Sequence, residues 1–181
     1  MAFEAYLFVD GIQGDSTSTT PAKIEPKPAN SAPIEIKTYG LGIEMPMVEN
    51  RSGTGAATVG RATFEDFETE KTLDVSTGSL LFFCLSGKHI NTALVAIYRT
   101  AGEDESAGKG SLYMKILYEH VVITEVAVKG GGDEMPSETL KFNYGKVSYY
   151  YYATDPKTGK TNTTPAEFIW DRVSNSGKKA G

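Results

Sequence analysis

The residues of this chain that could do chemistry are few and scattered. There are two histidines, His89 and His120, and one cysteine, Cys84. A thiolate beside an imidazole would make a nucleophile, but Gly87 is predicted to end a helix between Cys84 and His89. Glu119 and His120 are neighbours in a strand pattern, so their side chains are expected to face opposite ways and cannot chelate one metal. We therefore expect no catalytic residue, no metal site and no cofactor, and we interpret Cys84 as a core thiol.

Two short motifs hint at enzymes but are incomplete. Gly14-Asp15-Ser16 starts like a GDS-type hydrolase block, yet the leucine that should follow and a later Asp-x-x-His are missing. Gly159-Lys160-Thr161 ends like a phosphate-binding loop, but Thr154 stands where the first glycine belongs and no helix pattern follows. Both motifs are better explained as turns.

Composition limits the remaining classes. The 181 residues carry a formal net charge of −5, and 40% of them are hydrophobic, which fits a single domain over residues 1–181. Phosphate binding requires a basic stripe, and the only basic cluster is Lys178-Lys179, so we expect no nucleic-acid partner. The longest apolar run, residues 80–85, is far shorter than the roughly 20 residues that span a bilayer. Met1 is followed by Glu4 without a basic region, so we expect no secretory signal peptide and no membrane insertion.

One helix is predicted, within residues 73–90. Ser76, Thr77 and Ser79 are candidate N-caps because their hydroxyls can accept from the first N–H groups of a helix. The apolar run 80–85 suits burial. Gly87 then supplies the positive φ that ends many helices, and Lys88 and His89 follow it at the negative end of the dipole.

The rest of the chain reads as strands and loops. Apolar residues alternate, or β-branched residues cluster, in residues 2–10, 34–39, 62–69, 92–100, 112–118, 121–128, 138–152 and 168–170. Aromatic residues on the second face of 2–10 indicate that this strand is covered on both sides, and Gly145 marks a predicted bulge. Residues 17–33 hold four prolines and are expected to form an exposed loop, residues 174–181 a flexible tail.

Two further segments point to contacts between molecules. Residues 44–60 form a long loop in which Met45, Pro46, Met47 and Val48 make an apolar patch between polar or glycine-rich flanks. Four tyrosines at 149–152 would place two rings on each face of a strand. We expect one face in the core and one at a subunit interface; a stacking platform for single-stranded nucleic acid or sugar is the alternative, although no basic residue adjoins it.

About eight strands with one helix must protect their edges. Either the sheet closes into a barrel, or its edges pair with another copy of the chain. We predict a mainly β fold: a closed β-barrel of two packed sheets with one short α-helix and an extended loop.

Four segments, in order, resemble the Hcp (haemolysin-coregulated) proteins of the bacterial type VI secretion system. They are residues 1–7, the turn at 10–16, the helix and its stop at 76–89, and the strand at 137–147. The Pro-rich residues 17–33 depart from the family pattern as an insertion. The resemblance implies a barrel subunit that forms hexameric rings, which stack head to tail into the inner tube of an injection apparatus and are expelled from the cell, carrying effectors in the channel.

The resemblance also implies partners and a location. The partners are other copies of the chain, a spike protein, a sheath and effector proteins, and the chain is expected in the cytoplasm and then outside the cell. It implies no catalytic residues, and it suggests subunit contacts at Met45, Pro46, Met47 and Val48 in the 44–60 loop and at Ser86, Lys88 and His89 in the turn after the helix. A phage-type tail-tube protein and a monomeric β-barrel binding module are the alternatives.

Overall fold

The computed structural model describes residues 3–18, 24–47, 60–99, 110–132, 134–155, 157 and 161–180. These ranges contain eleven strands and one helix. The elements are β1 (Phe3–Val9), β2 (Ile34–Ile36), β3 (Ile43–Glu44), β4 (Thr63–Phe64), β5 (Phe67–Thr72), α1 (Thr77–Ser86), β6 (His89–Arg99), β7 (Ser111–Gly131), β8 (Glu134–Asn143), β9 (Lys146–Tyr151), β10 (Ala166–Asp171) and β11 (Ser176–Ala180).

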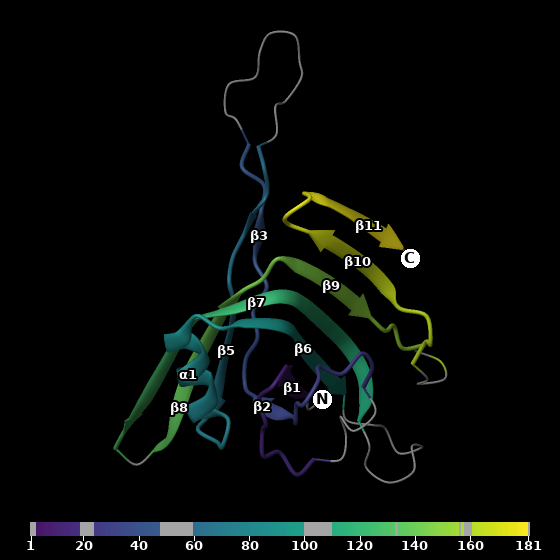
Figure 1. The fold of residues 1–181 in the computed structure, drawn as a ribbon. Coiled ribbons are helices and arrows are strands. Elements are labelled where there is room, and N and C mark those ends of the chain that lie inside the picture. Colours follow the sequence, from purple (N-terminus) through teal and green to yellow (C-terminus); the bar gives the residue numbers. More distant parts are fainter. Residues whose placement is uncertain are drawn as a thin grey trace.

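Nine strands form one curved antiparallel sheet (Figure 1). Its order is β11-β10-β9-β7-β6-β1-β2, and β8 joins β7 to β5. Strands β3 and β4 pair separately, Ile43 opposite Phe64, and lead away from the body of the molecule (Figure 1). We call residues 43–64 the arm; its residues 48–59, including Val48, lie outside the described ranges.

The predicted closed barrel of two packed sheets is wrong. The described strands make one large sheet and one two-stranded hairpin, and no ladder joins β2 to β5. Across this seam the backbone N–H of Lys37 donates to Glu70 O (2.7 Å), and that of Gly40 donates to Glu68 O (2.9 Å). Residues 37–40 continue alongside β5, but Thr38 meets it through side-chain bonds: its Oγ1 accepts the Glu70 N–H (2.9 Å) and its O accepts the Thr69 hydroxyl (2.6 Å). The contacts therefore do not form a continuous ladder, and the sheet is not closed.

The core lies on both faces of β1, as its aromatic second face predicted. Leu7 and Val9 belong to the main core, whereas Tyr6 and Phe8 pack in a smaller cluster on the outer face. Ile24, only 4% exposed, completes that outer cluster. The described part of the predicted exposed loop (17–18 and 24–33) contains no helix or strand and is exposed at about half of its residues, but Ile24, Pro28 and Ser31 are buried, so the loop also covers an apolar surface. Residues 19–23 lie outside the described ranges.

Two strand boundaries differ from those predicted, and for one reason. Residues 111–131 form a single strand where two were expected, whereas 134–151 form two strands where one was expected. His120 has a φ of 58°, and the Gly145 N–H lies within hydrogen-bond distance of both Glu119 O (3.0 Å) and His120 O (3.2 Å). A Cβ on Gly145 would lie 3.1 Å from that of His120. Strand β7 and the connection between β8 and β9 therefore bend at the same point, where glycine lacks a side chain and lets the two backbones come close.

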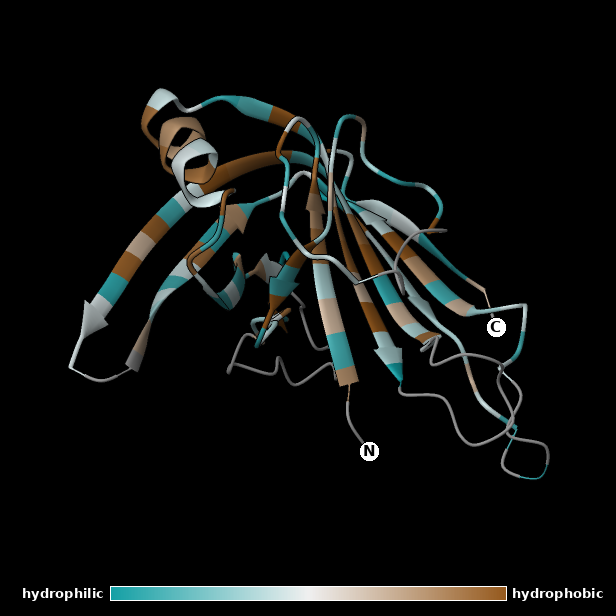
Figure 2. Cartoon of the chain, turned by 90° about the horizontal axis from the view of Figure 1, so that it is seen from below, coloured by the Kyte–Doolittle hydropathy of each residue, from teal (hydrophilic) through white to brown (hydrophobic). Residues whose placement is uncertain are grey.

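The helix ends as predicted but is buried on one side only. Gly87 has a φ of 58°, its N–H donates to Cys84 O, and that of Lys88 donates to Phe83 O. Leu80 and Phe83 are buried, but Leu85 is 86% exposed. A continuous apolar run must place some members on the outer side of a helix with 3.6 residues per turn. Figure 2 shows the apolar residues on the turns of α1.

Two more segments differ from expectation. In place of the tail expected for residues 174–181, residues 176–180 form β11, paired with β10. The predicted strand at 62–69 is divided into β4 and β5. The described part of the chain contains no helix with the length and apolarity needed to cross a bilayer.

Candidate assembly surfaces

The arm carries three of the predicted contact residues. Met45 and Met47 are 51% and 56% exposed, and Ile43 beside them is 45% exposed. Between the two methionines, Pro46 O accepts the N–H of Gly60 (3.1 Å), so the two sides of the arm stay connected. Exposed thioethers and an isoleucine projecting from the body are a surface that suits burial against a partner.

One arginine attaches the base of the arm. The guanidinium of Arg172, just after β10, lies 4.9 Å from the ring centre of Phe64 and 5.0 Å from that of Tyr144, beside two rings that meet edge to face. Its Nη1 donates to Tyr144 O (2.5 Å) and to Asn143 Oδ1 (3.2 Å). From the arm, Arg61 Nη2 donates to Arg172 O. These contacts surround an open groove of about 450 Å³ and orient an arm whose own strands have only two residues each.

Tyr144 is the buried aromatic residue at the base of the arm. Its ring is buried, and burial raises the pKa of its hydroxyl to about 12. The group is therefore a neutral phenol at physiological pH, and its ring presents an uncharged aromatic face to Arg172.

The second surface is the outer side of the helix. Leu81, Phe82 and Leu85 are 36%, 63% and 86% exposed, and Val75, before the helix, is 61% exposed. We missed these residues, although the helical period within the apolar run 80–85 was a sufficient signal. The predicted residues Ser86, Lys88 and His89 follow at the end of the helix and are also exposed. The Lys88 ammonium lies 4.2 Å from the ring centre of Phe83, which anchors it to the helix.

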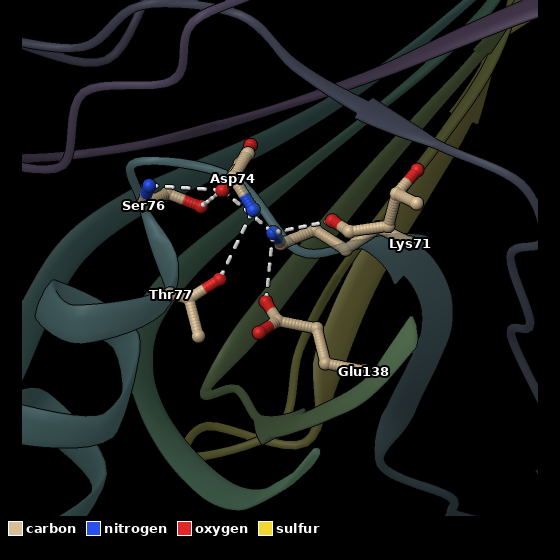
Figure 3. A network of polar contacts seen from close by, with 6 residues as sticks. Lys71, Asp74, Ser76, Thr77 and Glu138 are labelled. Carbon is tan, nitrogen blue, oxygen red and sulfur yellow. Dashed lines mark hydrogen bonds and ion pairs between the residues drawn. The ribbon is translucent and has the colours of Figure 1, made fainter. Parts of the chain in front are cut away.

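A buried ionic network holds the start of this helix (Figure 3). The Lys71 ammonium on β5 is fully buried and lies 2.7 Å from Asp74 Oδ1 and 2.8 Å from Glu138 Oε1 of β8. Neither Glu138 oxygen accepts a hydrogen bond from another group in the described residues, so its compensation depends on Lys71. The network joins two strands to the turn that begins the helix.

Asp74 takes the role that we assigned to a hydroxyl cap. Ser76 is the N-cap residue but makes no side-chain capping bond. Its backbone N–H (2.8 Å) and its hydroxyl both donate to Asp74 Oδ1, and Thr77 Oγ1 accepts the Asp74 N–H (3.2 Å). The sequence signal for this network was Lys71 itself, because it stands in phase with the inward-facing Phe67 and Thr69.

The tyrosine segment lies mainly within the protein. Tyr149 stacks on Phe168 at 5.4 Å and packs against the main core. On the other face, the Lys115 ammonium lies 4.7 Å from the ring centre of Tyr150. All four tyrosines are half-buried.

Neither Cys84 nor the two histidines belong to a recognisable catalytic or metal-binding cluster in the described residues. Cys84 is half-buried against the main core, as a packing residue would be. Within the described residues, no three His, Cys, Asp or Glu side chains lie where they could hold a metal ion. The features that stand out are therefore surfaces for contact.

Comparison with known proteins agrees with this geometry. Residues 6–151 match the family described as "Type VI secretion system effector, Hcp". The chain is 26% identical to Protein hcp1 of Pseudomonas aeruginosa over 116 residues, which cover 64% of this chain and 68% of that protein.

Solved structures share the fold. A type six secretion system protein superposes with a TM-score of 0.80 at 23% identity, covering 98% of this chain and all of the other. Hcp1 from Salmonella typhimurium superposes with a TM-score of 0.67 at 20% identity and similar coverage. The family is one of secreted tube proteins that self-associate in type VI secretion and is not a known enzyme family. With the family match spanning most of its length, this chain belongs to the Hcp family of type VI secretion proteins.

Proposed function

We propose that this chain is the structural subunit of a type VI secretion inner tube. Six copies form a ring, rings stack head to tail, and the stack is expelled with effectors in its channel. The observation that carries the proposal is the arm, which holds Met45 and Met47 in solvent away from the core of its own chain. An apolar patch in this position is stabilised when it is buried by a neighbour.

The helix surface supports the same function. Leu81, Phe82 and Leu85 give each subunit a second apolar contact, separate from the arm in the sequence and on a different element. Two unlike contact surfaces on one chain are what an assembly needs if it grows both within a ring and between rings. Ser86, Lys88 and His89 lie at the end of this helix, so we retain them as contact residues.

The other partners follow from the family. We propose that a sheath surrounds the tube, a spike protein caps it, and the chain is made in the cytoplasm and then secreted. The Hcp match favours this role over that of a phage tail tube.

Sedimentation velocity on the purified wild-type chain tests the proposal. The expected result is a species with six times the mass of one chain, which negative-stain images show as rings with a central channel. A mass equal to one chain from micromolar to millimolar concentration would contradict it and favour the monomeric binding module.

A further inference from the structure

The two ends of the large sheet differ in character. Strand β11 is its outermost strand, pairs only with β10, and has all five residues exposed. Among the described residues, none makes a backbone hydrogen bond to the other side of β11, which therefore presents free N–H and C=O groups. It also carries Lys178, 66% exposed and 3.5 Å from Glu167, and Lys179, which has no carboxylate within salt-bridge distance in the described residues. This end of the sheet is therefore a free strand edge that carries two lysines.

The opposite end is the seam between β2 and β5. Lys37 and Gly40 bridge the seam to β5 on one side of β2. Farther along, a groove of about 280 Å³ separates β2 from the segment after β5, and its lining includes Glu35, Asp15 and Met135. A second groove of about 310 Å³ shares Glu35 and adds Glu4 and Phe3. Together they make a furrow along the last strand of the sheet.

The furrow carries uncompensated negative charge. Glu4 accepts the Tyr6 hydroxyl (2.9 Å), and Glu35 accepts that of Ser16 (2.7 Å). Within the described ranges, no cation lies within salt-bridge distance of Glu4, Asp15 or Glu35. The rim is apolar, with Phe3 53% and Met135 76% exposed. The furrow therefore suits an extended segment with cationic side chains.

We propose that β11 of one subunit docks in the furrow of the next, with Lys178 facing Glu4 and Glu35. Successive side chains of a strand point to opposite faces, so Lys179 projects from the other face of β11, toward Asp15. The occupant is a second copy of this chain because the same sheet carries the complementary edge at its other end. Unlike surfaces that meet in this way form a heterologous contact, which closes into a ring when the rotation permits. The backbone of the β2 segment beside the furrow is largely paired already, since Pro33 O accepts the Ser16 N–H and the Lys37 N–H donates to Glu70 O. The complementary charges therefore carry the contact and select the partner edge. The inference rests on the proposed ring and identifies its contact between neighbours.

Charge exchange between two variants tests the contact. In K178E/K179E the edge and the furrow are both negative; in D15K/E35K both are positive. Each variant alone should need about 100-fold more protein to assemble, or should stay single, because every contact now brings like charges together. Mixed at equal concentrations they should form six-membered rings of strictly alternating subunits, since each edge then meets a furrow of opposite charge. Native mass spectrometry with one variant isotope-labelled measures the three-to-three composition.

Two controls distinguish loss of the contact from misfolding and from a general effect of the changed charge. K129E/K157E makes the same charge change at two exposed lysines that belong neither to β11 nor to the lining of the furrow, and it should assemble like wild type. Circular dichroism should show the wild-type sheet signal in every variant. If either test variant assembles alone as wild type does, or if the folded variants fail to assemble when mixed, the contact is wrong and the proposed function stands. If wild type forms no ring, the proposed function fails and the contact with it.

Discussion

The arm and the helix both expose apolar side chains, but they are attached to the molecule in different ways. The arm leaves the sheet through two-residue strands and is oriented at its base by Arg172. The helix starts from a buried ionic network and lays Leu80 and Phe83 into the main core. Changes at the arm should therefore affect assembly with little effect on folding, whereas changes beneath the helix should affect folding first.

The largest loss of unfolding free energy is expected from substitution of Lys71, in the network that anchors the helix. The substitution Lys71→Met keeps the volume but leaves the buried Glu138 carboxylate without its cation. Removing one partner of a buried ion pair costs about 3–5 kcal/mol of unfolding free energy. Urea unfolding followed by circular dichroism measures it. The double variant Lys71→Met/Glu138→Leu removes both charges and should recover more than half of the loss; a single variant as stable as wild type would show that the network does not anchor the helix.

Substitution of Arg172 should have an intermediate effect, lowering both the stability of the fold and the strength of assembly. Arg172→Ala removes two ring contacts and two hydrogen bonds at a half-buried site, for a loss of about 1–2 kcal/mol. Assembly should weaken as well, because the arm loses its orientation. Arg172→Lys, which keeps the charge but not the planar fork, should recover only part of the assembly. Wild-type assembly in Arg172→Ala would mean that the arm does not depend on this base.

Cys84 should show a smaller effect that belongs entirely to packing. Cys84→Ala is expected to cost about 1 kcal/mol of unfolding free energy, because the thiol packs against the core from a half-buried position. Ring assembly should stay unchanged. Loss of assembly at unchanged stability would instead place Cys84 in a contact or a reaction, and sedimentation beside urea unfolding distinguishes the two.

The sequence predicted local features better than closure of the sheet. Gly87 ended the helix as expected, and the aromatic face of β1 correctly indicated cover on both sides, because each depends on residues a few positions apart. Whether a ladder would join β2 to β5 depended on how residues 37–40 pass along β5, where backbone bonds at Lys37 and Gly40 flank side-chain bonds at Thr38, and no local pattern predicts that. Gly145 was predicted as a bulge, but the matching bend at His120 could not be read, since it is set by two strands facing each other.

The residues of the candidate surfaces were likewise predicted where a local pattern exists and missed where a contact joins distant parts of the chain or where the pattern was misinterpreted. The methionines of the arm were predicted because an apolar patch in a polar loop is visible in sequence. The exposed side of the helix was missed because a continuous apolar run was interpreted as entirely buried. Six consecutive residues surround the helix axis, so all of them are buried only if the helix is covered on every side. Arg172, more than 100 positions from the arm that it orients, gave no signal.

The most direct test of the account is the arm variant Met45→Asp/Met47→Asp, compared with wild type by sedimentation velocity. Both residues are exposed, so unfolding free energy should stay within about 0.5 kcal/mol of wild type. The charged side chains should prevent the arm from burying against a neighbour, and rings or stacks of rings should disappear. A mass distribution like that of wild type at the same concentration would contradict the claim that the arm is an assembly contact.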